Sequence, residues 1–257
     1  MPRRAFARAV AALALAGVLA AAPAFPQELD PKDLENRVDY AYFTEDVGTL
    51  RNLIREARTT FAKGSPDAVA HYALGFAHYR LGAVLAAKEP SAAAAAMSKC
   101  IDELDEAIEA DPQSAEAQAL QGACLGQLAA LRTISAMVNG PRSASRLEKA
   151  LKLAPQNPRV VLLEALAVYA KPKAFGGDKA GALTKLRRAT ELFDEAAALS
   201  ELALPGWGHA DAQAALGRSL LEAGDTLGAR NALERALILA PEFAAARRLL
   251  AQIGAAR

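Results

Sequence analysis

Aromatic residues, histidine and cysteine are scarce in this chain of 257 residues. It has one Trp, five Tyr, eight Phe, three His and two Cys, and 30 Lys and Arg balance 29 Asp and Glu. Nucleic-acid binding requires clustered basic charge, so this balance argues against it. Long alternating strand patterns are missing too, whereas alanine runs favour helix. The composition predicts an all-α protein, with 53% hydrophobic residues available for a core.

Motifs of catalysis and metal binding are also missing. The sequence has no Ser-x-x-Lys, Gly-x-Ser-x-Gly, His-Glu-x-x-His or P-loop pattern. On one helix His71 and His78 would lie about 10 Å apart, too far for both to bind one metal ion. His209 lies far along the chain, and the acidic residues around Asp102 fit the solvated face of a helix. We therefore expect no enzyme activity, no cofactor and no metal site.

The N-terminus has the pattern of an export signal. Three arginines within the first eight residues precede an apolar run over residues 10–22, and Ala22-Pro23-Ala24 offers a cleavage site. We predict a secretory signal peptide over residues 1–24. The alternative is an uncleaved membrane anchor, but the run is shorter than the roughly 20 apolar residues that span a bilayer. Its removal would leave 27 basic and 29 acidic residues in a periplasmic or secreted chain without stable membrane insertion.

One stretch, residues 210–241, has the pattern of a complete helix–turn–helix unit. Small or apolar residues mark the first helix, a turn follows, and the second helix ends at a proline: Leu216, Gly217, Leu220, then Gly224-Asp225, then Ala229, Leu233, Ala236 and Pro241. Gly217 and Ala229 leave room where the two helices cross. Gly224 suits a left-handed backbone, and Asp225 can accept hydrogen bonds from the amides of the second helix.

This order of residues resembles the tetratricopeptide-repeat (TPR) family, whose period is about 34 residues. The resemblance implies a TPR-type α-solenoid of about five helix pairs over residues 25–257. We expect repeats near 31–62, 68–112, 115–155, 158–193 and 210–241, and a capping helix over 242–254 at the open end of the stack. The segments 175–178 and 205–208 are similar to features of exported bacterial TPR proteins.

Three of the repeats carry inserts, which we expect to enlarge the turns between their helices. The inserts are an alanine-rich stretch over 88–96, the segment 134–145, and the segment 171–178 with its Gly176-Gly177 pair. Enlarged turns of this kind could cover the groove of a solenoid.

First helices of TPR repeats line the inner, concave face, so the resemblance implies a partner-binding surface there. Its residues would be Tyr42, Phe43, Tyr72, Phe76, Tyr79, Arg80, Arg159, Tyr169 and Arg218. Tyrosine and arginine often anchor interfaces. Tyr72, Phe76 and Tyr79 recur at helical spacing and share a face that we expect to be surplus to core packing. The alternative is that several of these side chains belong to the core or lie beneath the inserts.

Two functions follow from the resemblance. One is a periplasmic protein-binding or scaffolding module that engages a peptide or protein partner through its concave face. The other is a structural accessory subunit of an envelope transport or assembly system. Both predict a protein partner in the cell envelope.

The two cysteines, Cys100 and Cys124, are candidates for a disulfide. Exported proteins keep such bonds, and antiparallel neighbouring helices would bring these two positions together. The alternative is two separate small core residues. A separation of the α-carbons above about 7 Å would exclude the bond.

Overall fold

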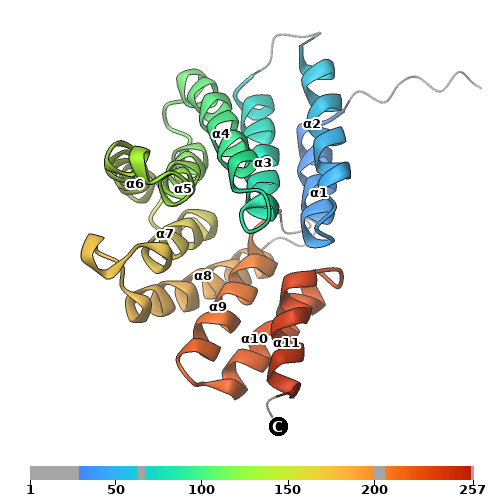
Figure 1. Ribbon diagram of the computed structural model, residues 1–257. Helices are drawn as coiled ribbons and strands as arrows, with labels where there is room; N and C mark the ends of the chain where they lie inside the picture. The colour runs from blue at the N-terminus through green and yellow to red at the C-terminus, as the bar shows by residue number, and fades with distance from the viewer. Residues whose placement is uncertain (1–28, 63–66, 200–205, 256–257) are drawn as a thin grey trace, which may run out of the picture.

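The computed structural model describes residues 29–62, 67–199 and 206–255, and over these ranges the chain forms eleven α-helices and no β-strand. Consecutive helices form five pairs, followed by one further helix (Figure 1). The pairs are α1 (Pro31–Phe43) with α2 (Val47–Phe61), α3 (Ala68–Leu85) with α4 (Pro90–Ala110), α5 (Ala115–Leu131) with α6 (Thr133–Leu153), α7 (Pro158–Ala170) with α8 (Lys179–Leu199), and α9 (His209–Glu222) with α10 (Thr226–Leu239), and the last helix is α11 (Ala244–Ala255). The all-α class and the five helix pairs are confirmed.

The predicted signal peptide, residues 1–24, lies outside the described residues, and its cleavage stays a prediction. Pro205, at the start of the segment likened to exported TPR proteins, also lies outside them. None of the helices in the described ranges combines the length and the apolar character that a membrane crossing needs.

Side-chain caps mark several helix starts. Asp46, Asp67 and Asn157 each accept a 2.9 Å hydrogen bond from a free amide in the first turn of α2, α3 and α7. Between α9 and α10, Gly224 has a φ of +84°, and the carboxylate of Asp225 accepts from an amide of α10 at 2.8 Å. The roles predicted for these two residues are confirmed.

Two of the three inserts lengthen helices rather than turns, which corrects the expectation from sequence. α4 begins at Pro90 and α6 at Thr133, so most of the first insert and all of the second are helical. The alanine run has high helix propensity, and Pro90 stands in the first turn, where its missing N–H costs little. Pro141 lies inside α6 and does not end it. The enlarged turn is the one between α7 and α8, with a short 3-10 helix, η1 (Lys173–Phe175).

Glycines in the first helices let the pairs pack closely. A Cβ atom added at Gly75, Gly122 or Gly217 would lie 2.7, 2.8 or 2.6 Å from the Cγ of a leucine in the paired helix. Atoms of two side chains do not approach so closely, so these positions admit only glycine without a shift of the leucine. The close crossing predicted at Gly217 therefore recurs in three of the pairs.

We expect Gly122→Val to lower the free energy of unfolding by about 1–3 kcal/mol, because its side chain would overpack the contact with Leu147. Urea unfolding followed by circular dichroism would measure the change. Ala95→Val, on the exposed face of α4, is the control and should cost less than about 1 kcal/mol. Equal effects of the two substitutions would contradict the close crossing.

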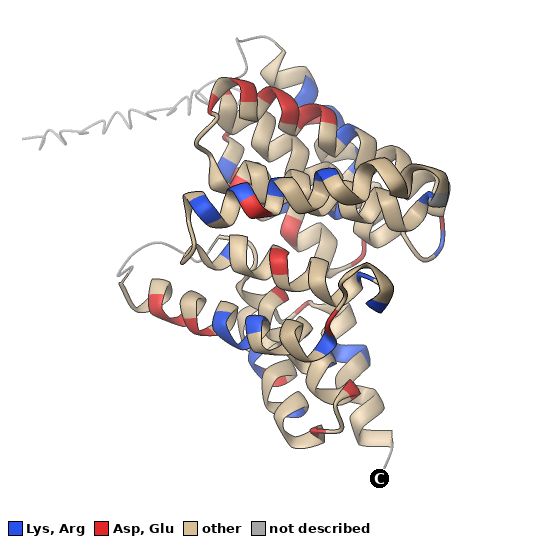
Figure 2. Ribbon diagram, turned by 90° about the vertical axis from the view of Figure 1, so that its left-hand side faces the viewer, with Lys and Arg blue, Asp and Glu red and all other residues tan. Residues whose placement is uncertain are grey.

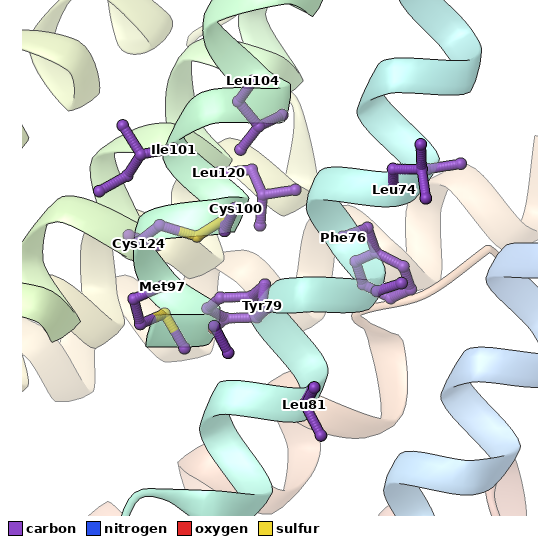
Figure 3. Close-up of a cluster of buried hydrophobic side chains, with 14 of the residues drawn as sticks. Leu74, Phe76, Tyr79, Leu81, Met97, Cys100, Ile101, Leu104, Leu120 and Cys124 are labelled. Atoms are coloured by element: carbon purple, nitrogen blue, oxygen red, sulfur yellow. A yellow bond between two sulfur atoms is a disulfide. The ribbon is translucent and has the colours of Figure 1, made fainter. Parts of the chain in front are cut away.

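A disulfide joins α4 to α5. Cys100 and Cys124 are bonded, with their α-carbons 6.3 Å apart, and the predicted bond is confirmed. Figure 3 shows it among buried side chains that include Met97, Leu104 and Leu120. Both cysteines are fully buried, so the bond crosses the core between the second and third repeats.

The end of the chain returns to its beginning. Figure 1 shows α10 and α11 next to the end of the α1–α2 pair. The ring centroid of Phe243, just before α11, lies 5.9 Å from that of Tyr42 and 4.5 Å from that of Phe43. Arg248 of α11 pairs with Glu45 in the α1–α2 turn. As predicted for the capping helix, α11 packs on α9 and α10 at the end of the stack. It also contacts the α1–α2 turn, so the two ends of the solenoid meet.

Candidate functional site

Arg80 of α3 is the centre of a buried polar cluster where α1, α3 and α9 meet. The residue is 2% exposed. Its guanidinium donates two hydrogen bonds to Asp211 of α9, at 2.7 and 2.8 Å, and pairs with Asp39 of α1 at 2.7 Å. The ring of Tyr42 lies 4.1 Å from the guanidinium carbon. A charge buried this deeply needs such partners, so the three ionic side chains hold one another in place.

Trp207 fills the space beside this ion cluster. The residue is 4% exposed, and its ring stacks on Phe76 with centroids 5.0 Å apart. Its indole N–H donates to the hydroxyl of Tyr72 at 3.0 Å, and its carbonyl accepts from Nε of Arg159 at 3.0 Å. The guanidinium carbon of Arg159 also lies 5.1 Å from the indole centroid. Ring, N–H and carbonyl of one residue are thus all engaged by the first helices.

Glu116 of α5 links α3 and α7 next to Trp207. Its carboxylate accepts from Arg159 at 2.6 Å, from the Tyr72 hydroxyl at 3.3 Å and from Asn157 at 2.9 Å. A cavity of about 280 Å³ borders Tyr72, Glu116 and Asn157 at the N-terminal ends of α3, α5 and α7. We call the following eight residues the inner cluster: Asp39, Tyr42, Tyr72, Phe76, Arg80, Arg159, Trp207 and Asp211.

Two carboxyl groups at this site hold protons more tightly than usual. Burial raises the pKa of Asp39 to about 6, against the opposing effect of the Arg80 charge. Burial also raises the pKa of Glu35 to about 7; the charge of Arg159 opposes the rise, and those of Glu116 and Asp39 add to it. The folded chain therefore takes up protons here at a pH where the unfolded chain has released them.

We expect Glu35→Gln to stabilise the fold by about 2–3 kcal/mol at pH 8 and hardly at all at pH 4. With a folded pKa of about 7 against an ordinary 4.5, Glu35 weakens the fold progressively as the pH rises from 4.5 through 7. Urea titrations at pH 4, 6 and 8 would measure the difference. Glu109→Gln, on the exposed face of α4, is the control and should change little at any pH. A gain independent of pH would contradict the assignment.

The structure brings together five of the nine residues predicted to bind a partner: Tyr42, Tyr72, Phe76, Arg80 and Arg159. Phe43 packs on Phe243 next to them. Tyr169 and Arg218 lie elsewhere, with the Arg218 guanidinium 4.7 Å from the Tyr169 ring. The Tyr169 hydroxyl bonds to Glu222.

The argument that the aromatic face of α3 is surplus to the core was wrong at two positions. Phe76 and Tyr79 are 0% and 6% exposed. The two reasons differ. Trp207 covers Phe76, whereas Tyr79 lies within the core of the second and third repeats, beside Met97 and the disulfide (Figure 3). A role of these residues in partner binding stays a prediction, and it requires that the site open.

Trp207, Asp211 and Glu116 are members of the site that the sequence argument missed. Trp207 lies between two glycines and is the only tryptophan of the chain, which could have singled it out. Asp211 belongs to the clearest repeat, yet its partner Arg80 lies 131 residues away. No periodic pattern connects positions so distant.

The three histidines take no part in the site. His71 pairs with Glu103 at 2.9 Å, and His209 with Asp194 at 3.1 Å. His78 is buried, which lowers its pKa to about 4. Within residues 29–62, 67–199 and 206–255, no group of three or more His, Cys, Asp or Glu side chains is placed to hold a metal ion.

Two solved structures share this arrangement of helices over most of their length. A thermophilic TPR protein of Thermus thermophilus, TTC0263, matches with a TM-score of 0.60 and 15% identity, over 87% of this chain and 98% of that one. The chain has the tetratricopeptide-repeat fold. The HusA haemophore of Porphyromonas gingivalis also matches, with a TM-score of 0.57 and 21% identity, over 77% of this chain and 96% of that one. No family model and no curated protein matches the sequence.

In this TPR fold, side chains of α1, α3 and α7, each the first helix of its pair, meet at the site. The unexpected feature is what they contact there. Trp207 and Asp211, from the start of α9, occupy the position at which a partner would meet Tyr72, Arg80 and Arg159. The candidate site is therefore built and already filled from within the chain.

Proposed function

We propose that this TPR protein is a protein-binding scaffold that acts in the periplasm or outside the cell. The observation that carries the proposal is the convergence of arginine and aromatic side chains from separate repeats on the inner face. The guanidinium groups of Arg80 and Arg159 lie against the rings of Phe76 and Trp207, the combination of side chains that anchors protein partners. Figure 2 shows both signs of charge interspersed along the helices, which suits a protein partner better than nucleic acid.

Export is supported by two independent features. One is the signal-like N-terminus, and the other is the disulfide between Cys100 and Cys124, a bond that persists in oxidising compartments. We expect the mature chain to begin at Phe25 or within a few residues of it. N-terminal sequencing of protein recovered from the envelope fraction would measure this, and an intact Met1 on exported protein would contradict it.

Affinity capture from envelope extracts, with the mature chain as bait, tests the scaffold function. Two predicted partner-binding residues outside the inner cluster, half-buried Tyr169 and exposed Arg218, provide the variant. Tyr169→Ala with Arg218→Ala should lower the recovery of a specific partner. Lys99→Ala with Lys152→Ala, on the exposed faces of α4 and α6, is the matched control and should not. Recovery of no specific partner by the wild-type chain would refute the proposal, and equal recovery by all three baits would refute a role of Tyr169 and Arg218 in it.

A second candidate, an accessory subunit of an envelope transport or assembly system, is favoured by one feature. Ile134, Met137 and Val138, at helical spacing on α6, are 98%, 87% and 61% exposed. Exposed apolar side chains in a group mark surfaces that a stable partner covers. The same capture separates the two functions, because Ile134→Asp with Met137→Asp should abolish a stoichiometric complex held through α6 and leave binding at the inner face intact.

A further inference from the structure

The segment from Trp207 to Asp211 is held by the first helices in the manner of a bound peptide. Four of its groups each have a receiving side chain in α3 or α7. These are Phe76 for the indole ring, Tyr72 for the indole N–H, Arg159 for the Trp207 carbonyl and Arg80 for the Asp211 carboxylate. An aromatic anchor, a bound main-chain carbonyl and a bidentate carboxylate are the contacts with which grooves recognise segments of other chains.

The junction differs from ordinary helix packing. α9 packs along α8 and α10, whereas its contact with α3 is made by the carboxylate of Asp211, in the first turn of α9, with the guanidinium of Arg80. The two glycines that flank Trp207 allow a close approach of the backbone. A Cβ atom at Gly206 would lie 1.9 Å from Nη2 of Arg159, and Gly208 has a φ of +111°. The segment therefore fits its site because its aromatic residue stands between two glycines.

The charges of the site select an acidic occupant. Without Asp211, Arg80 would keep only Asp39 as an ionic partner for a guanidinium that is almost completely buried. A neutral occupant would leave part of that charge unpaired, which is costly in the interior. Arg159 likewise needs an acceptor for its Nε–H. The cavity beside Tyr72 and Glu116 lies at the edge of the site.

We propose that the inner cluster is a binding site for a partner segment that carries an aromatic residue and, four positions later, an aspartate or glutamate, and that residues 207–211 occupy this site until such a segment replaces them. The inference rests on the proposed scaffold function, since it names the kind of segment that the scaffold binds. A partner segment that replaces residues 207–211 makes the same kinds of contact that they lose. Residues 207–211 belong to the same chain as the site, so they compete at a high effective concentration. A free segment therefore binds the wild-type chain weakly and an emptied site much more tightly.

The single tryptophan of the chain makes the exchange directly observable. The probe is a synthetic peptide of residues 206–217 in which phenylalanine replaces the tryptophan, so that all indole emission comes from Trp207. Added to the full mature chain, it should move that emission to longer wavelength in a saturable way, because Trp207 leaves its buried site for water. A matched peptide with alanine at the aromatic position and asparagine at the acidic position should leave the emission unchanged.

The affinity of the site gives a second measurement. A labelled copy of the peptide should bind the variant Trp207→Ala with Asp211→Asn at least tenfold more tightly than the wild-type chain by fluorescence anisotropy. If saturating peptide leaves Trp207 buried, or if the alanine–asparagine peptide shifts its emission equally, residues 207–211 have only a structural role and the proposal is overturned. This test uses the wild-type chain, so it stands even if the double variant fails to fold. A captured partner that binds while Trp207 stays buried would overturn this site and leave the scaffold function standing.

Discussion

Replacing Arg80 with methionine is expected to lower the free energy of unfolding by about 3–5 kcal/mol. Methionine keeps much of the length of the side chain but removes the charge. Asp39 and Asp211, whose side chains are 15% and 10% exposed, would then face each other without a cation. An uncompensated buried charge is the costly outcome here, more than the loss of the hydrogen bonds. Urea unfolding followed by Trp207 fluorescence and by circular dichroism would measure the loss.

Two variants show whether the loss arises from the buried charges. Arg248→Met breaks the exposed ion pair between Arg248 of α11 and Glu45 in the α1–α2 turn, where the two ends of the solenoid meet. It should cost less than about 1 kcal/mol. Adding Asp39→Asn and Asp211→Asn to Arg80→Met removes the unpaired charges and should restore most of the stability. If Arg80→Met lowers the free energy of unfolding no more than Arg248→Met does, the buried ion pairs of Arg80 do not hold the two ends of the solenoid together.

The repeats could be predicted from sequence because their signals are local. Gly217 and its paired leucine lie within one helical hairpin, and Gly224 with Asp225 forms the turn between its helices. Each of these residue types is required by contacts within the same helical hairpin. The same locality explains the error over the inserts, since a departure from the period shows extra residues but not whether they extend a helix or a turn.

The closure of the solenoid could not be predicted in this way. It depends on the sum of small rotations between successive repeats, which brings α9 and α11 back to α1 and α3. The pair of Arg80 and Asp211 is a consequence of that sum, as is the contact of Phe243 with Phe43. The family resemblance identified inner-face residues such as Arg80 and Arg159, but it carried no information on what would lie opposite them.

Reduction of the disulfide is expected to lower the free energy of unfolding by about 3 kcal/mol, since the bond closes a loop with a sequence separation of 24 in the unfolded chain. The relevant comparison is the urea midpoint of the wild-type chain with and without a reductant, after complete reduction in denaturant and refolding. Cys100→Ala with Cys124→Ala is the control and should unfold at the same midpoint under both conditions.

The loss of stability expected on reduction predicts a weaker fold in a reducing compartment. Because both sulfur atoms lie in the core between α4 and α5, the reduced chain must keep two thiols packed there without the covalent link between the second and third repeats. A chain synthesised in a reducing compartment would then hold this junction more weakly, and its second and third repeats should lose amide-exchange protection before the α9–α10 pair does. Hydrogen exchange of oxidised and reduced protein, resolved by peptide, measures this directly. Equal protection of α4 and α5 in both forms, with free thiols verified, would contradict a stabilising role for the bond.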